Sequence, residues 1–448
     1  MKLKNILRIL LLLFGYFILL FGVYSGIVIV TGGFSLIDTL LMCALPLLAI
    51  YFLFLYPIIV VAMVRLHRRK TRIWLLPVIL GIIAFSFNLL PFTGISSTVK
   101  SGNAQFETVF GTDYMTKIPT NLTSKFMTSP FNLWNMYNYY NDFECNFTKN
   151  CGPYLIDPIA NDSFYFDYYC PISGEGPFPT IINIHGGGWV IGNKGAPENR
   201  PMASRYLAQQ GYAVFDIQYG LGQFPEDAFV NDALGLVQGF LGREMLNRSY
   251  TVPEIIVQIL GNFTDYLVAH AAEYKVNTNC VYVTGNSAGG HLTGMFLGYN
   301  NTLYKNIFNQ TLKLKGLILF YCPANITHLY QTHSDDFITN FVDLGGYMAK
   351  IFGGTPEENA SLFQAISPIN LVDEWAPPCL ILHGEQDKMV PYVEALQLKQ
   401  ALDDVNRPVI LLSFPFQGHA FDYGFNSPGG QVSLYFFERF LAATQYCS

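Results

Sequence analysis

The chain has 448 residues, of which 51% are hydrophobic and only 13% are charged, and its formal net charge is −6. This length exceeds that of one ordinary domain, and the apolar excess indicates that part of the chain lies in an apolar solvent. The negative charge and the lack of a basic stripe in the second half argue against a nucleic-acid-binding protein.

Three apolar runs open the chain, at about residues 6–30, 36–64 and 73–92. Each is long enough to cross a hydrocarbon core of ~30 Å, which takes about 20 apolar residues. A cleaved signal peptide is the alternative for the first run, but this run is longer than a signal core and two more follow it. A buried helical bundle is the alternative for all three, and the lack of a polar face argues against it. We therefore predict a transmembrane region with three helices over residues 1–92.

Basic residues flank these runs unevenly. Lys2, Lys4 and Arg8 lie at the N-terminus, and the turn RLHRRKTR at 65–72 joins the second and third runs, whereas the turn TGGFSLID has no lysine or arginine. The positive-inside rule places the N-terminus and the 65–72 turn in the cytosol. Three crossings then put the remainder on the lumenal or extracellular side. We expect a multi-pass protein of the secretory pathway, in the endoplasmic reticulum, Golgi or plasma membrane.

Glycosylation sequons and cysteines agree with a lumenal second half. Nine sequons follow the third run, at Asn121, Asn146, Asn161, Asn247, Asn262, Asn300, Asn309, Asn325 and Asn359. Only Cys43 of the eight cysteines lies in the membrane part. Cys145 and Cys151 are close in sequence and could form a disulfide, with Cys170 as the rival partner. We read Cys280, Cys322 and Cys379 as buried thiols beside strands.

The remainder of the chain divides into a lead-in and a regular part. Residues 93–163 are polar and aromatic, and we expect an irregular lead-in there with up to two edge strands. Over residues 164–448, short apolar runs such as YAVFDIQY and KGLILFYCP alternate with helical patterns such as MASRYLAQQG, a region from about 225 to 274, and VSLYFFERFLAAT. This alternation predicts an α/β fold whose mainly parallel sheet is covered on both faces. Catalytic residues in such folds lie at the carboxyl ends of strands.

Four predicted strand ends carry polar residues beside glycine. The motifs are HGGGW from His185, GNSAG around Ser287, HGEQD ending at Asp387, and QGHAF around His419. A serine hydroxyl needs a base to take its proton, and the base needs an acid to orient it. GNSAG matches G-x-S-x-G, in which small flanking residues let a strained turn display the serine above the sheet.

In this order the four motifs resemble the α/β-hydrolase fold, and within it the hormone-sensitive-lipase-like and carboxylesterase group with an HGGG oxyanion loop. The chain is similar to membrane-anchored prenylcysteine methylesterase-like members of that group, over roughly residues 164–445. The resemblance implies that Ser287 is the nucleophile, His419 the base and Asp387 the acid that orients it. It also implies an oxyanion hole formed by the backbone N–H groups of Gly186, Gly187 and Ala288.

Several residues near these motifs have other interpretations. A lone G-x-S-x-G arises by chance, and a glycine turn before a helix can hold a phosphate, although no P-loop lysine follows here. His291 lies four residues into the helix, where it packs or caps, and His383 makes a structural hydrogen bond. Glu385 is the alternative acid, but Asp387 fits the family position better. No histidines or cysteines have metal-ligand spacing, so we expect neither a metal nor a cofactor.

These residues together predict a membrane-anchored serine hydrolase that cleaves carboxylic esters of lipid, acetyl or prenylcysteine type through an acyl-enzyme. Its partners would be a small-molecule or lipid ester substrate and the membrane bilayer. The alternatives are a non-catalytic adhesion or binding protein on the same fold, and an amidase or formamidase. The apolar stretch YTVPEIIVQILGNFTDYLV, from Tyr250, is a lid, a membrane-facing surface or an ordinary packed helix.

Overall fold

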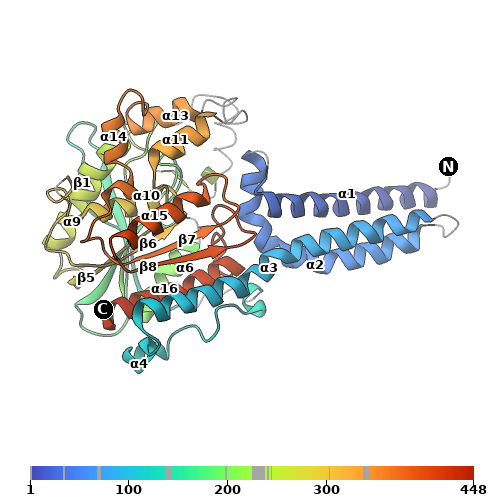
Figure 1. Cartoon of the computed structure of the whole chain (residues 1–448), viewed down its shortest axis with the longest axis horizontal. Helices are drawn as coiled ribbons and strands as arrows, with labels where there is room; N and C mark the ends of the chain where they lie inside the picture. The colour runs from blue at the N-terminus through green and yellow to red at the C-terminus, as the bar shows by residue number, and fades with distance from the viewer. Residues whose placement is uncertain are drawn as a thin grey trace.

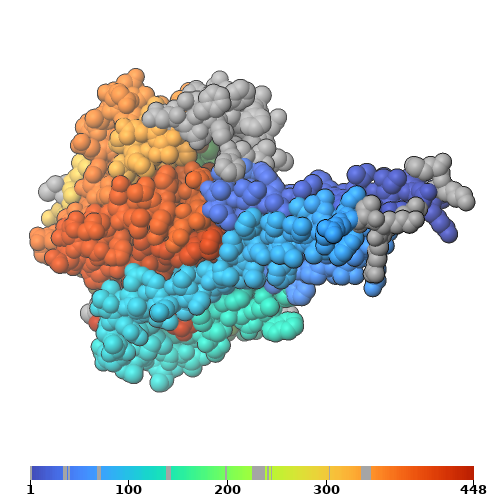
Figure 2. Space-filling model, turned by 45° about the vertical axis from the view of Figure 1, so that its right-hand side comes forward, coloured from blue at the N-terminus to red at the C-terminus, as the bar shows by residue number. Residues whose placement is uncertain are grey.

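The computed structural model consists of a bundle of long helices that projects from a larger α/β part (Figures 1 and 2). It describes residues 3–33, 36–67, 72–137, 143–196, 199–223, 238–239, 242–243, 245–301, 303–335 and 344–447. The bundle comprises α1 (Leu3–Thr31), α2 (Leu36–Leu66) and α3 (Leu75–Phe110), the last preceded by the short helix η1 (Arg72–Trp74). Among the described residues, these three helices are long and apolar enough to cross a membrane.

Small residues and one buried amide hold the bundle together. Gly22 of α1 lies against the ring of Tyr56 in α2, and Gly26 lies against Phe87 in α3, so a side chain at either glycine would collide with its neighbour. The fully buried Asn88 donates hydrogen bonds to the carbonyls of Gly22 (3.0 Å) and Ala84 (2.8 Å). Close approach at small residues and interhelical polar contacts are the usual basis of helix packing in lipid.

The third helix is longer than predicted, because residues 93–110 of the expected lead-in continue α3. The rest of the described lead-in has short helices and one edge strand, β1 (Asn146–Ile156). Gln105 accepts a hydrogen bond from the N–H of Leu411 (2.9 Å) and donates one to its carbonyl (2.8 Å), and Thr98 Oγ1 donates to Ser413 O (2.6 Å). Leu411 and Ser413 belong to β8 (Val409–Phe414), which lies at one edge of the sheet. Side chains of α3 thereby satisfy backbone groups that a further strand would otherwise occupy.

The sheet has eight strands in the order β1-β2-β4-β3-β5-β6-β7-β8. Pairing is antiparallel for β1 with β2 and for β2 with β4, and parallel from β4 through to β8. The predicted mainly parallel α/β sheet is confirmed. The strands are β1 (Asn146–Ile156), β2 (Ser163–Cys170), β3 (Phe178–Ile184), β4 (Ala213–Ile217), β5 (Val276–Asn286), β6 (Leu314–Phe320), β7 (Cys379–Gly384) and β8 (Val409–Phe414).

Helices cover both faces of the sheet, each over its own hydrophobic core. One face carries α3, α6 (Asn199–Gln210) and α16 (Pro428–Tyr446), and the other carries α9 (Gly261–Ala269), α10 (Ala288–Gly294) and α15 (Tyr392–Asp404). Three helices form a cap near the end of α1: α11 (Ile326–Asp335), α13 (Leu344–Phe352) and α14 (Ala360–Ala365). The short elements are α4 (Tyr114–Lys117), α5 (Thr120–Thr123), η2 (Leu133–Met136), α8 (Val252–Glu254), η3 (Ile255–Leu260), η4 (Met295–Gly298) and η5 (Pro368–Leu371).

The apolar stretch from Tyr250 is a packed helix in which α8 continues through the π-helical segment η3 into α9. Ile255, Ile259 and Phe263 are buried in the hydrophobic core, so this stretch is neither a lid nor a lipid-facing surface. The first part of the predicted helical region, residues 224–237, lies outside the described residues.

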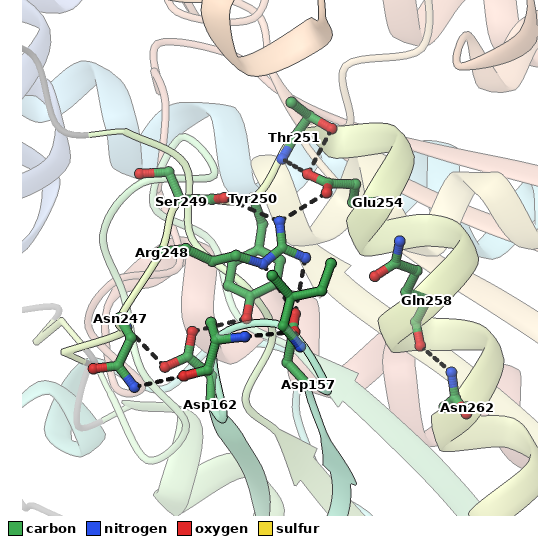
Figure 3. Close-up of polar contacts among 12 residues, drawn as sticks. Asp157, Asp162, Asn247, Arg248, Ser249, Tyr250, Thr251, Glu254, Gln258 and Asn262 are labelled. Atoms are coloured by element: carbon green, nitrogen blue, oxygen red, sulfur yellow. Dashed lines mark hydrogen bonds and ion pairs between the residues drawn. The ribbon is translucent and has the colours of Figure 1, made fainter.

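A polar network fixes the start of this helix (Figure 3). The Arg248 guanidinium contacts Asp157 Oδ2 at 2.8 Å and Glu254 Oε1 at 2.8 Å, and it stacks over the ring of Tyr250. The Tyr250 hydroxyl donates to Asp162 Oδ2 (2.8 Å). Because Asp157 and Asp162 form the turn between β1 and β2, the network ties that hairpin to the start of α8.

The disulfide considered between Cys145 and Cys151 is absent from the structure, where every cysteine is a free thiol. The strand β1 has an irregularity between Thr148 and Cys151. It still carries the two cysteines to different levels along β2, because Asn146 is opposite Cys170 and Cys151 is opposite Phe166. Cys145 Sγ instead lies 3.9 Å from Arg205 Nη1, and Cys151 Sγ lies 3.6 Å from Thr148 O.

The buried carboxyl of Asp216 leads to a prediction about stability and pH. Burial raises its pKa to about 7, and the charge of Asp167 on the adjacent strand acts in the same direction. The folded protein therefore binds a proton that the unfolded chain releases near pH 4, so the free energy of unfolding falls as pH rises towards 7. Between pH 5 and 8, the Asp216 carboxyl should lower the free energy of unfolding by about 2 kcal/mol. We expect this decrease to be absent in Asp216→Asn. Thermal unfolding in detergent across this range measures it, and equal slopes for both proteins would contradict it.

Candidate active site

Ser287 occupies a strained turn between β5 and α10. Its backbone is at φ 55° and ψ −122°, which holds the side chain out at the carboxyl end of the sheet. A Cβ on Gly285 would collide with the carbonyl of Gly289, and one on Gly289 would collide with the carbonyl of Ile184. Close backbone packing is therefore the reason why this turn contains small residues.

Three side chains from distant parts of the sequence meet at this turn. His419 Nε2 lies 3.0 Å from Ser287 Oγ, and His419 Nδ1 lies 2.8 Å from Asp387 Oδ2. Ser287 follows β5, Asp387 follows β7, and His419 follows β8, so all three come from carboxyl ends of parallel strands. The arrangement allows His419 to take the Ser287 proton while its other nitrogen donates to the carboxylate.

Asp387 is held as a carboxylate although it is buried. Its Oδ1 accepts the backbone N–H groups of Met389 and Val390, both at 2.9 Å, and His383 Nε2 lies 3.4 Å from Oδ2. Burial alone would raise the pKa of Asp387, but the neighbouring His419 and His383 imidazoles hold it well below its usual range. A fixed negative charge therefore faces the base.

A glycine loop after β3 lies beside the serine. A Cβ on Gly186 would approach the Ser287 side chain and the carbonyl of Asn286, so the two loops are in direct contact. The Tyr347 hydroxyl of α13 donates to Gly188 O at 2.9 Å and helps to hold the loop. Within the described part of the chain, no residue accepts a hydrogen bond from the N–H groups of Gly186, Gly187 or Ala288. Free N–H groups next to a nucleophile are what an oxyanion hole requires.

Two adjacent glycines in this loop provide a matched test. Gly187 is at φ 120°, and a Cβ there would collide with the Ile191 carbonyl, whereas Gly188 is at φ 59° with Tyr347 Oη 3.6 Å away as its nearest neighbour. We expect Gly187→Ala to lower kcat by about 10²–10³-fold through displacement of the oxyanion N–H groups. Gly188→Ala should change it by less than about fivefold, because alanine fits the left-handed region at modest cost. Steady-state hydrolysis of a p-nitrophenyl ester compares them, and equal losses would exclude the assigned geometry.

Three other histidines near the motifs are held by contacts within the fold. His291 Nε2 lies 2.7 Å from the carbonyl of Ile366, and burial lowers its pKa to about 4. His185 stacks on the ring of Tyr219 with centroids 4.1 Å apart, and burial likewise lowers its pKa to about 4. His383 Nε2 lies 2.9 Å from Val390 O. Glu385, the substitute acid, is exposed and forms no hydrogen bond with His419 among the described residues.

A second polar network behind the site was not predicted from the sequence. Tyr321 Oη accepts from Asn286 Nδ2 (2.9 Å) and donates to Asp422 Oδ1 (2.7 Å), and its ring lies against His419 with centroids 4.5 Å apart. Arg200 Nη2 lies 3.6 Å from Asp422. The network braces the residues next to Ser287 and His419. The only feature of the sequence that pointed to this network was the position of Asp422, three residues after His419.

The ends of the apolar helices lie against the loops that carry Asp387 and His419. Gly32, directly after α1, packs against the carbonyl of Gln386 and the side chain of Lys388, on either side of Asp387. Met42 of α2 covers Gly418, next to His419, so closely that a Cβ on this glycine would lie 3.1 Å from Met42 Cβ. The carboxyl end of the sheet therefore faces the helical bundle, as Figure 1 also shows.

The sequons lie at the surface of the α/β part and of the segment leading into it. Six of the asparagines are exposed, namely Asn121, Asn146, Asn161, Asn247, Asn262 and Asn300. The other three are half-buried, namely Asn309, Asn325 and Asn359.

Comparison with known proteins finds relatives that are named esterases and others that are named peptidases. The family model BD-FAE matches residues 166–233 and 249–402. The chain is 26% identical over 249 residues to esterase LipQ of Mycobacterium tuberculosis, covering 54% of this chain and 50% of that protein. It is 25% identical over 278 residues to the probable carboxylic ester hydrolase LipM of the same organism, covering 60% and 56%. The chain thus spans about half the length of these curated relatives.

Two further comparisons concern a plant relative and the fold. Isoprenylcysteine alpha-carbonyl methylesterase ICME of Arabidopsis thaliana is 22% identical over 282 residues, covering 60% of this chain and 57% of that protein. The crystal structure of esterase B from Lactobacillus rhamnosis superposes with a TM-score of 0.50 at 19% identity, covering 67% of this chain and 86% of that one. At this identity the superposition shows the shared fold.

Proposed function

Because the chain belongs to the α/β-hydrolase carboxylesterases of the hormone-sensitive-lipase-like type, we propose that it is a membrane-anchored serine hydrolase of carboxylic esters. The observation that carries the proposal is the hydrogen-bonded chain from Asp387 through His419 to Ser287, with distances of 2.8 and 3.0 Å. The named activities of LipQ and LipM support the ester as the bond that is cleaved.

The geometry supports a two-step acyl transfer. His419 Nε2 takes the proton from Ser287 Oγ as this oxygen attacks the ester carbonyl, and the resulting oxyanion is held by the N–H groups of Gly186, Gly187 and Ala288. His419 then gives its proton to the leaving alcohol, and Asp387 stabilises the imidazolium in between. Water repeats the sequence on the acyl-enzyme, which releases the acid and restores Ser287.

The position of the site favours a lipophilic ester within this class. The loops on either side of Asp387 and next to His419 rest on the bundle ends, so a substrate dissolved in the membrane has a short path to Ser287. Lipid, acetyl and prenylcysteine-type esters all suit the triad, and the likeness to isoprenylcysteine methylesterase supports the last of them.

The proposed topology places the α/β part in the lumen or outside the cell. Arg8 Nε donates to Leu66 O at 2.8 Å, so Arg8 lies beside the end of α2 that carries Arg65, at the bundle end far from the sheet. Positive charge at that end favours the cytosol. The sequons lie on the other side, and treatment with a glycosidase should therefore reduce the mass of protein from its native host.

A fluorophosphonate probe and a substrate panel test the function. We expect the probe to label the full-length protein in detergent on Ser287, identified by mass spectrometry, and not to label Ser287→Ala. Hydrolysis should be faster for p-nitrophenyl esters than for matched anilides, and the series of acyl lengths then identifies the preferred ester. Absence of labelling would favour the adhesion or binding alternative, and preference for the anilides would favour the amidase.

A further inference from the structure

A cluster of large apolar side chains is exposed on the segment that leads from α3 to the sheet. In Phe131–Tyr137, with the sequence FNLWNMY, Trp134 is 71% exposed, Tyr137 41% and Leu133 40%. The segment contains no charged residue. Exposed apolar groups that are contiguous mark a contact surface and are uncommon without a partner.

This segment lies directly beside the apolar helices. The ring of Tyr137 is 5.8 Å from that of Tyr51 in α2, and the ring of Phe131 is 6.2 Å from that of Phe92 in α3. Phe92 comes just before Gly94, which lies against the carbonyl of Pro415, so this contact is at the level where α3 meets the α/β part. Tyrosine and tryptophan concentrate at this level of a membrane protein, where their rings lie among lipid headgroups.

An open groove continues the cluster along α3. Its volume is ≈ 600 Å³, and its walls include Phe92, Ile95, Val99 and Phe131, with Lys100 on the same wall. Lys100 is exposed and forms no ion pair with any described residue. Apolar walls beside an unpaired ammonium group suit an acyl chain and the phosphate to which it is attached.

The segment is also held firmly to the catalytic part. The N–H of Asn132 donates to Gln431 Oε1 of α16 (2.9 Å), and Asn426 Nδ2 donates to the carbonyl of Met136 (2.9 Å). Asn426 lies on the loop that follows His419. The segment that carries Trp134 is therefore joined to the loop that follows His419.

We propose that Leu133, Trp134 and Tyr137 form a second membrane contact, which inserts into the headgroup region of the bilayer that α1–α3 cross. The contact holds the carboxyl end of the sheet toward the lipid surface. The inference rests on the membrane insertion advanced as part of the proposed function, so its test must separate the two.

Depth-dependent quenching of tryptophan fluorescence provides this test. Three full-length variants each keep the buried Trp189 and one other tryptophan, and the two remaining tryptophans are replaced by phenylalanine. Trp134 is the test position. Trp375 is the matched control, because it is 64% exposed but precedes β7, at the amino end of the sheet. Trp74, in η1 at the far end of the bundle, reports membrane insertion itself. Labelling by the fluorophosphonate probe shows that each variant is folded.

The proteins are reconstituted into phosphatidylcholine nanodiscs with or without bromine on the upper acyl chain. We expect brominated lipid to reduce the Trp134 and Trp74 signals to about half, since both positions would lie near the interface, and to leave Trp375 unchanged. Quenching of Trp74 without quenching of Trp134 would overturn the second contact but leave the membrane insertion of α1–α3 standing. Self-association of the protein through Trp134 would give the same result. Absence of quenching at Trp74 would overturn membrane insertion as well.

Discussion

Ser287→Ala is expected to lower kcat for ester hydrolysis by about 10⁴–10⁶-fold, because no other described hydroxyl bonds to His419. The fold should be unaffected. Alanine tolerates the φ of 55° no worse than serine does, and the only side-chain hydrogen bond that is lost is the one to His419. Burst titration with a p-nitrophenyl ester measures both the loss of turnover and the number of active sites.

Ser433 offers a matched control for this substitution. It is a buried serine in α16 whose hydroxyl has no hydrogen-bond partner among the described residues. Ser433→Ala should therefore leave the burst and the turnover unchanged. Retention of turnover by Ser287→Ala at the level of the Ser433 variant would exclude Ser287 as the nucleophile.

Asp387→Asn is expected to lower kcat by about 10³–10⁴-fold, for a reason specific to this site. The backbone N–H groups of Met389 and Val390 both point at Oδ1, so the carbonyl oxygen of an asparagine would face them. The amide NH₂ would then face His419 Nδ1, which could only accept. The proton of the imidazole would move to Nε2, and a nitrogen that carries a proton cannot take one from Ser287.

The neighbouring carboxylate of Glu385 separates this effect from a general loss of charge. Glu385→Gln removes one negative charge two residues away on the same loop, but its side chain is exposed and does not reach the base. We expect its kcat to remain within about twofold of the unsubstituted protein, as for most surface substitutions. A loss of kcat in Glu385→Gln as large as that in Asp387→Asn would show that Asp387 is not the acid that orients His419. Thermal unfolding of both variants shows whether either change acts through stability.

The sequence indicated the parallel sheet and the members of the proposed triad for a common reason. Apolar runs such as those around Ile182 and Leu380 are local patterns, and the polar residues that follow them come at known strand ends. Carboxyl ends of parallel strands share one edge of a sheet. The sequence therefore predicts that three residues lie close together without knowledge of any contact between them, namely Ser287, Asp387 and His419.

Other features depended on contacts that local patterns do not contain. The extension of α3 to Phe110 depends on the edge strand β8, whose backbone groups Gln105 satisfies. The support of Asn286 by Tyr321, and of Gly188 by Tyr347, joins residues that are far apart in the chain. The thiols of Cys145 and Cys151 are near in sequence, but strand geometry separates them.

By itself, the sequence determined the apolar helices, the order of strands and helices along the α/β part, and which polar residues lie at strand ends. Each of these follows from hydrophobic periodicity and the placement of glycine over short windows. Only the tertiary structure decided that the ends of α1 and α2 lie on the loops of Asp387 and His419, and that Trp134 is exposed on the segment whose Tyr137 contacts Tyr51. Such contacts arise from shape and packing between segments that the chain brings together only when it folds.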